Sequence, residues 1–142
     1  MTGRGSVTRR AVLRRSFAWV AAVACGCATT PQEIKALGVR AQLEVAMPYR
    51  EAAACVITRI EELIVYADST LRRNIRNELK IHEREDYADI IGDNRGGGTY
   101  VVTLRALGPS RSAAQIFVSD NMISPKVIAD NISSAVARCG GR

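Results

Sequence analysis

Hydrophobic residues recur after residue 38 with two different periods. Residues 39–46 alternate between apolar and polar side chains, which predicts a half-buried strand. A helix is predicted from about Pro48, since apolar residues then recur at helical spacing: Ala53, Val56, Ile57, Ile60 and Ile64. A second helix is predicted to begin at Ser124 and Pro125 and to end at Gly140 and Gly141. Its apolar stripe is Ile128, Ile132, Ala135, Val136 and Cys139.

The centre of the chain predicts short strands separated by turns. Residues 79–82, 87–91, 99–107 and 113–118 are apolar or alternating, whereas 92–98 and 108–110 carry turn residues. Residues 68–78 suit a short helix or a basic loop equally well. Two amphipathic helices each need a sheet face to cover. We therefore expect an α+β fold, a two-layer sandwich in which an antiparallel sheet of about four strands carries both helices on one face.

The first 27 residues differ in composition from the rest of the chain. They contain five arginines and no acidic residue, and the arginines precede the apolar residues 16–26 (SFAWVAAVACG). A basic segment, a short apolar segment and small residues in this order are typical of a secretory signal peptide. The apolar segment is shorter than the about 20 residues of a spanning helix. An amphipathic helix that stays on the protein is the alternative.

Residues 8–14 (TRRAVLR) resemble the twin-arginine export motif, in which Ser or Thr and two arginines precede an apolar residue, Leu and a basic residue. The resemblance implies that Arg9 and Arg10 form the export signal and that the domain folds before it crosses the membrane. The basic segment of an ordinary secretory signal is the alternative.

Residues 24–27 (ACGC) resemble the lipobox of bacterial lipoproteins, in which small residues precede a cysteine that is acylated and becomes the new N-terminus. The resemblance implies a signal peptide over 1–26, a lipidated N-terminus at Cys27 with a tether over 27–38, and one globular domain over 39–142. Several acyl chains make such an anchor effectively permanent, whereas one chain binds only marginally. The residue after Cys27 is Ala28 and not Asp, which by resemblance to Gram-negative lipoproteins implies sorting to the outer membrane, facing the periplasm. Cleavage before Cys25, or near Ala28 without lipidation, are the alternatives.

The cysteine count favours Cys27 as the lipidated residue. Cleavage there discards Cys25 and leaves Cys55 and Cys139, which can pair in an oxidising compartment. Cleavage before Cys25 would leave an unpaired thiol. We therefore predict a disulfide between Cys55 and Cys139 that joins the two helices. Two buried free thiols are the alternative.

The net charge changes with the signal peptide. The whole chain has 20 basic and 14 acidic residues, a formal charge of +6. Removing the five N-terminal arginines leaves 15 basic against 14 acidic residues, or +1. A nearly neutral domain with few aromatic residues is not expected to bind nucleic acid.

Few residues indicate catalysis or metal binding. His82 is the one histidine, and its place on an alternating strand predicts that it points to solvent, away from Leu79 and Ile81. The acidic residues between Glu83 and Asp93 lack the spacing of a calcium loop and suit a solvated strand end. Residues 96–98 (GGG) precede a strand, so we interpret them as a flexible hairpin turn, not a phosphate-binding loop. No enzymatic activity, cofactor or metal is therefore predicted.

One basic cluster remains in the mature domain. It comprises Arg72, Arg73 and Arg76, which could contact an anionic lipid or could form a solvated patch balanced by nearby acids. The leading hypothesis is a non-enzymatic, lipid-anchored protein of the cell envelope, a structural or assembly accessory that binds another envelope protein. A small periplasmic module that binds a peptidoglycan fragment, a lipid or an effector is the alternative.

Overall fold

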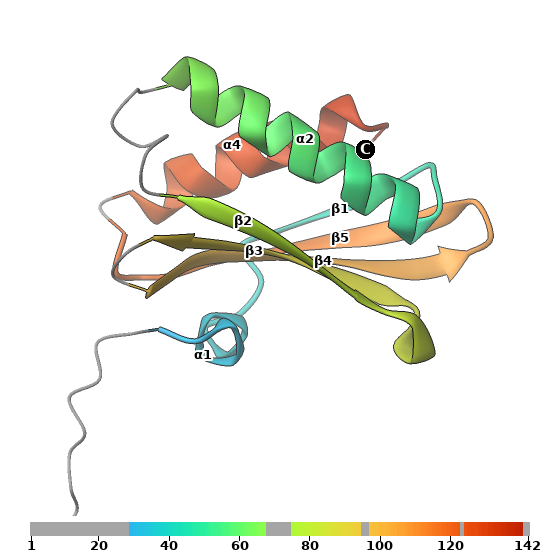
Figure 1. Ribbon diagram of the computed structural model, residues 1–142, viewed down its shortest axis with the longest axis horizontal. Coiled ribbons are helices and arrows are strands. Elements are labelled where there is room, and N and C mark those ends of the chain that lie inside the picture. Colours follow the sequence, from blue (N-terminus) through green and yellow to red (C-terminus); the bar gives the residue numbers. More distant parts are fainter. Residues whose placement is uncertain (1–28, 68–74, 95–96, 123, 141–142) are drawn as a thin grey trace, which may run out of the picture.

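The computed structural model describes residues 29–67, 75–94, 97–122 and 124–140 (Figure 1). Within these ranges the elements follow in the order α1 (Pro31–Ala36), β1 (Ala41–Val45), α2 (Tyr49–Ala67), β2 (Arg76–His82), the 3-10 helix η1 (Glu83–Glu85), β3 (Tyr87–Asn94), β4 (Gly97–Gly108), β5 (Arg111–Val118) and α4 (Pro125–Arg138). None of the described helices is long and apolar enough to cross a membrane.

The strands form one antiparallel sheet with the order β1-β5-β4-β3-β2. The predicted α+β class with an antiparallel sheet is confirmed, but the sheet has five strands where about four were expected. The difference lies in the ambiguous middle segment, because β2 starts at Arg76 and extends the alternation seen from Leu79. Consecutive strands β2 to β5 pair as a meander, and β1 pairs with β5 and forms the other edge of the sheet.

Helices α2 and α4 lie side by side on one face of the sheet (Figure 1). The residues that point from the sheet toward them are almost fully buried, among them Ile90, Tyr100, Val102, Leu104, Ile116 and Val118. From the helices, Val56 and Ile60 of α2 and Ile132 and Val136 of α4 complete this core. The described side chains of both predicted helical stripes therefore face the sheet. Gly140 adopts φ 82 directly after α4 and ends the helix, as its position predicts.

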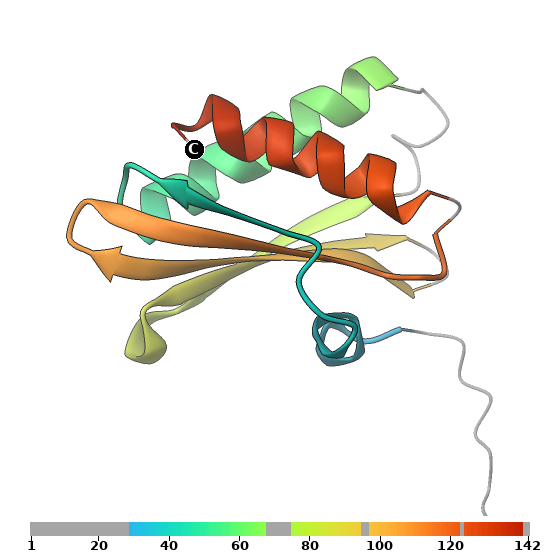
Figure 2. The ribbon, with the colours of Figure 1, turned by 180° about the vertical axis from the view of Figure 1, so that it is seen from behind.

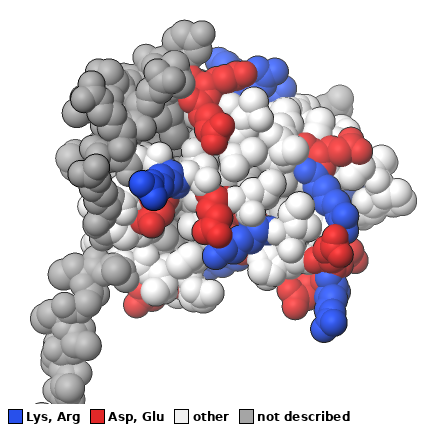
Figure 3. All heavy atoms as spheres, in the orientation of Figure 1, with Lys and Arg blue, Asp and Glu red and all other residues white. Residues whose placement is uncertain are grey.

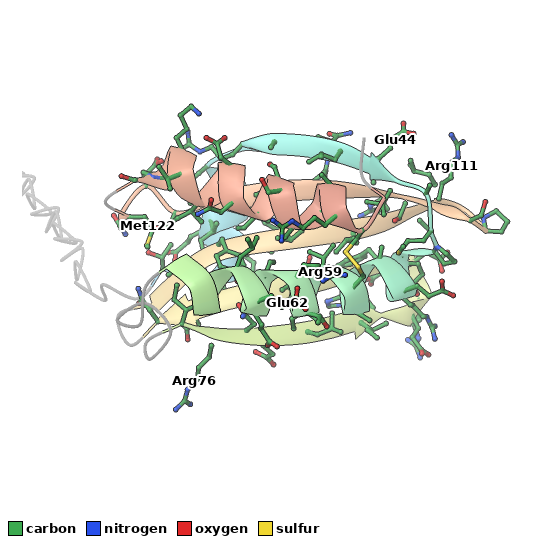
Figure 4. The ribbon with its side chains drawn as sticks, turned by 90° about the horizontal axis from the view of Figure 1, so that it is seen from above. Glu44, Arg59, Glu62, Arg76, Arg111 and Met122 are labelled. Atoms are coloured by element: carbon green, nitrogen blue, oxygen red, sulfur yellow. A yellow bond between two sulfur atoms is a disulfide. The ribbon has the colours of Figure 1, made fainter. Side chains whose placement is uncertain are left out.

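A disulfide joins the two helices, as the sequence predicts. The sulfur atoms of Cys55 on α2 and Cys139 at the end of α4 are 2.00 Å apart, and their Cα atoms are 6.0 Å apart. Figure 4 shows this bond between the two helices, seen from above. The pair is 84 residues apart in sequence, so it connects the first large helix with the last.

The short helix α1 lies on the opposite face of the sheet, where it packs against β4 and β5 (Figure 2). Its Ile34 is completely buried against Val101 and Phe117 and forms a second, small core. Residues 31–36, expected to belong to the tether, are therefore part of the fold. Thr30 caps the helix: its hydroxyl accepts from the Glu33 N–H at 3.3 Å, and the Glu33 carboxylate accepts from the Thr30 N–H at 2.6 Å. These hydrogen bonds lower the pKa of Glu33.

Two glycines allow close packing at one end of the sheet. A Cβ at Gly92 would lie 2.3 Å from the Tyr100 ring, and a Cβ at Gly98 would lie 2.7 Å from Ile34 Cδ1 and 2.9 Å from the Thr29 carbonyl oxygen. The prediction of a turn over residues 92–98 is therefore wrong in part, because β3 continues to Asn94 and β4 begins at Gly97. Gly98 makes room for α1.

Candidate functional site

The face of the sheet that carries α1 holds a group of charged and aromatic side chains that lie close to one another. Here the strands place polar and charged side chains where the opposite face places the core. In register across β2, β3 and β4 lie two rows: His82, Tyr87 and Arg105 form one, and Lys80, Asp89 and Thr103 form the next. Helix α1 covers part of this face and adds Lys35. We call the following group the Asp89 cluster: Lys35, His82, Tyr87, Asp89, Thr103 and Arg105.

Asp89 is the centre of this cluster. It is only 7% exposed, and its carboxylate accepts hydrogen bonds from Lys35 Nζ at 2.8 and 2.9 Å and from the Thr103 hydroxyl at 2.7 Å. Both oxygens of a buried carboxylate need such partners, because burial without them is costly. The expectation that Asp89 belongs to a solvated strand end is therefore wrong. Its side chain points under α1, and α1 supplies the neutralising charge.

Tyr87 lies next to Asp89 and is surrounded by cationic and aromatic groups. The His82 ring stacks on it with centroids 4.3 Å apart, and Lys35 Nζ and the Arg105 guanidinium lie 5.5 and 5.3 Å from its centroid. Loss of hydration and the nearby carboxylates of Asp89 and Glu85 raise the pKa of Tyr87. Three strands and one helix therefore hold this aromatic ring in a defined position.

His82 is placed differently from the prediction. It lies on the face opposite Leu79 and Ile81, as expected, but its side chain is only 35% exposed and stacks on Tyr87. Its Nε2 is buried 3.8 Å from Asp89 and has no hydrogen-bond partner within the described residues, whereas Nδ1 lies 3.9 Å from Glu85. An acid–base–nucleophile relay needs a hydroxyl or thiol hydrogen-bonded to the imidazole. The contacts described for His82 are to carboxylates and an aromatic ring.

The acidic run after His82 forms the turn between β2 and β3. Residues Glu83–Glu85 form η1, and Asp86 turns the chain with φ 52, a conformation that aspartate tolerates better than most residues. The Glu83 carboxylate pairs with Arg50 of α2 at 3.1 Å. Among the described residues no group of three or more His, Cys, Asp or Glu side chains could hold a metal ion.

The predicted export and lipid residues Arg9, Arg10 and Cys27 lie outside the described residues, as do Arg72 and Arg73 of the basic cluster. Arg76 is exposed at the start of β2 and lies opposite Asp93 of β3. Figure 4 shows Arg76 and Met122 at one end of the molecule and Glu44 and Arg111 at the other. In Figure 3, acidic and basic side chains are interspersed over the visible face.

Sequence reasoning missed most of the Asp89 cluster. Lys35 and Asp89 are 54 residues apart, and each lies between apolar neighbours, so neither belongs to a recognisable charged motif. One signal was present: Thr30-Pro31-Gln32-Glu33 has the spacing of a capping box with Pro at the first helical position, which predicts a helix start. With α1 placed, Ile34 and Lys35 become candidates for contact with the sheet.

Comparisons of the chain with protein-family models, with curated proteins and with solved structures find no match. The function is therefore argued from the residues and their geometry.

Proposed function

We propose that the protein is a non-enzymatic, lipid-anchored domain of the bacterial cell envelope that binds another envelope protein through the exposed part of the Asp89 cluster. The resemblances of the N-terminal residues to a signal peptide and a lipobox support export and anchoring in the membrane. The disulfide is the single observation that carries the proposal furthest, because such bonds persist in oxidising compartments and are rare in the cytosol.

The binding surface is inferred from rigidity and residue type. Tyr and Arg are enriched among residues that dominate binding energies, and side chains that are already fixed lose less entropy on association. Tyr87 and Arg105 fit this description, since they are held 5.3 Å apart, centroid to guanidinium, on adjacent strands. Arg105 is exposed, whereas Tyr87 is half-buried. An exposed arginine beside a tyrosine that is already held in place suits a protein partner.

The alternative, a module that binds a small ligand, receives less support. Such sites are lined mostly by apolar side chains. The apolar face of this sheet is filled by α2 and α4, and Tyr100, Val102 and Ile116 on it are at most 2% exposed. A ligand would have to bind the polar face instead, and the crosslinking experiment below separates the two cases.

Photo-crosslinking in living cells tests the partner. A photoreactive residue at Arg105 is expected to give one discrete adduct with a membrane-fractionating protein, whereas the same residue at Ser134, exposed on α4, is expected to give none. Tyr87→Ala should abolish the adduct, and Arg111→Ala, an exposed arginine paired with Glu44 at the other edge of the sheet, should leave it unchanged. Equal adducts at both positions, or none at Arg105, would count against a partner on this face.

A further inference from the structure

We infer that one corner of the sheet lies directly on the lipid headgroups, so that the anchor fixes the orientation of the domain as well as its location. The inference rests on the proposed lipidation of Cys27. We call the corner the entry corner: it is formed where the described chain begins, by the start of β4 and by the loop after β5, and comprises Thr29, Thr30, Gly97, Asp120 and Asn121.

Thr29 belongs to the fold. The Thr29 carbonyl accepts from the Gly98 N–H at 3.0 Å, and its hydroxyl accepts from the Asn121 side-chain amide at 3.0 Å. Thr30 then caps α1, and Ile34 follows in a fully buried position. Thr29 is therefore held between β4 and the loop after β5, and it cannot extend toward the membrane without breaking these contacts.

This docking leaves almost no tether. Only Ala28 separates Thr29 from Cys27. Two Cα–Cα steps span at most about 7 Å. The headgroup layer of one leaflet is about 5–8 Å thick, since the whole bilayer is about 40–45 Å and its hydrocarbon core about 30 Å. A lipidated Cys27 among the headgroups therefore brings the entry corner into contact with them.

The chemistry of the entry corner suits headgroup contact without insertion. Thr30 and Asn121 are exposed and polar, and the Asp120 carboxylate is paired with the Arg40 guanidinium. The large apolar side chains that are exposed in the described chain lie outside the corner: Leu37, Val39, Ile81, Leu107 and Val127. The described residues of the corner therefore offer no hydrophobic wedge, and we infer that the acyl chains are what enters the hydrocarbon.

The direction of β4 then sets where the Asp89 cluster stands. Strand β4 begins at the entry corner with Gly97 and ends at Gly108, beside the turn that contains Ser110. Arg105 lies seven residues beyond Gly98, which is about 23 Å along the strand. We place β4 pointing away from the lipid, so that the Tyr87 and Arg105 surface lies at a distance from the headgroups and within reach of a partner.

Fluorescence quenching by nitroxide-headgroup lipids tests this orientation. The lipidated protein is placed in vesicles of phosphatidylethanolamine, phosphatidylglycerol and the nitroxide lipid. A thiol-reactive fluorophore is attached either at Gln32→Cys or at Ser110→Cys. Both positions are exposed; Gln32 lies three residues from Thr29 outside its docking contacts, and Ser110 lies at the far end of β4. We expect the Gln32 probe to be quenched several times more strongly than the Ser110 probe.

A spacer provides the matched control. Insertion of 20 Gly/Ser residues between Ala28 and Thr29 gives the tether a root-mean-square length of about 25 Å. Quenching of the Gln32 probe should then fall to near that of the Ser110 probe. Equal quenching of the two probes in an acylated protein without the spacer would overturn the orientation and leave the proposed anchor standing. A mature protein whose mass shows no acyl chain would overturn the anchor itself.

Discussion

Replacing the two cysteines by alanine should remove a large part of the stability of the domain. The Cys55→Ala/Cys139→Ala variant loses a crosslink between residues 84 apart in sequence. In the chain-entropy model, a closed loop of that size restricts the unfolded chain by about 4–5 kcal/mol at 25 °C. Domains are typically stable by only about 5–15 kcal/mol, so the variant should be close to the limit of folding.

Urea unfolding followed by circular dichroism measures this difference. With a slope of about 2 kcal/mol/M, a loss of 4–5 kcal/mol lowers the midpoint by about 2 M. The wild-type protein under reducing conditions is the control, because it keeps both sulfur atoms and loses only the bond. Its midpoint should lie slightly above that of the variant, because the variant also loses the packing of the buried Cys139 sulfur, whereas Cys55 is only partly buried.

Two results would refute this reasoning. If the variant and the oxidised wild type differ by less than about 1 kcal/mol, the loop-entropy estimate does not apply to this fold. If reduced wild type is far more stable than the variant, the packing of the sulfur atoms between α2 and α4 matters more than the bond. Two reactive thiols in the mature, non-reduced protein would exclude the pairing outright.

Three further predictions concern the sheet and its two faces. A double-mutant cycle on Lys35 and Asp89, each replaced by alanine, should give a coupling free energy of about 1–3 kcal/mol. The Lys126–Asp130 pair has a similar distance but is much more exposed, so its coupling should be at most about 0.5 kcal/mol. Equal couplings would contradict the role of burial. Gly92→Ala should destabilise the fold by about 2 kcal/mol or more, because its Cβ would lie 2.3 Å from the Tyr100 ring. Gly108→Ala, whose Cβ would have no atom within 4 Å, should have little effect. Thermal unfolding compares the two variants, and similar losses of stability would argue against the steric cause. Burial, with a smaller contribution from the Glu61 charge, raises the pKa of the Tyr100 phenol, so the folded state favours the neutral form; its stability should be complete below about pH 10 and fall above it by up to about 1.4 kcal/mol per pH unit. Tyr100→Phe should show a shallower alkaline decline in the urea-unfolding free energy, and identical slopes would contradict the assignment.

The long elements were predictable because each carries a repeated pattern. The stripes of α2 and α4 extend over several turns, and both Val56 and Val136 are buried as their spacing predicts. The hairpin of β4 and β5 follows from two apolar runs around Gly108 and Pro109. These patterns arise within one or two neighbouring elements, so they can be recognised without knowledge of the rest of the fold.

The site was not predictable in the same way, because it depends on contacts between distant segments. Helix α1 has six residues and one buried side chain, Ile34, which is too little for a periodic signal. From the sequence, Asp89 looks like part of a solvated strand end; only the fold shows that β3 turns its side chain toward α1, where Lys35 contacts it. Gly98 looks like a flexible turn residue until the Thr29 carbonyl is placed against it. Each of these assignments can be made only once the positions of the strands in the sheet are known.

Anchoring of the protein through Cys27 can be measured as the mass of the mature protein extracted from the membranes of a bacterial host. Anchoring through Cys27 predicts a chain that begins at Cys27 and carries the added mass of its acyl chains, and a Cys27→Ala variant that keeps the mass of the unprocessed precursor. A mature wild-type chain that begins at Ala28 or later, or one that begins at Cys27 without added mass, would contradict it.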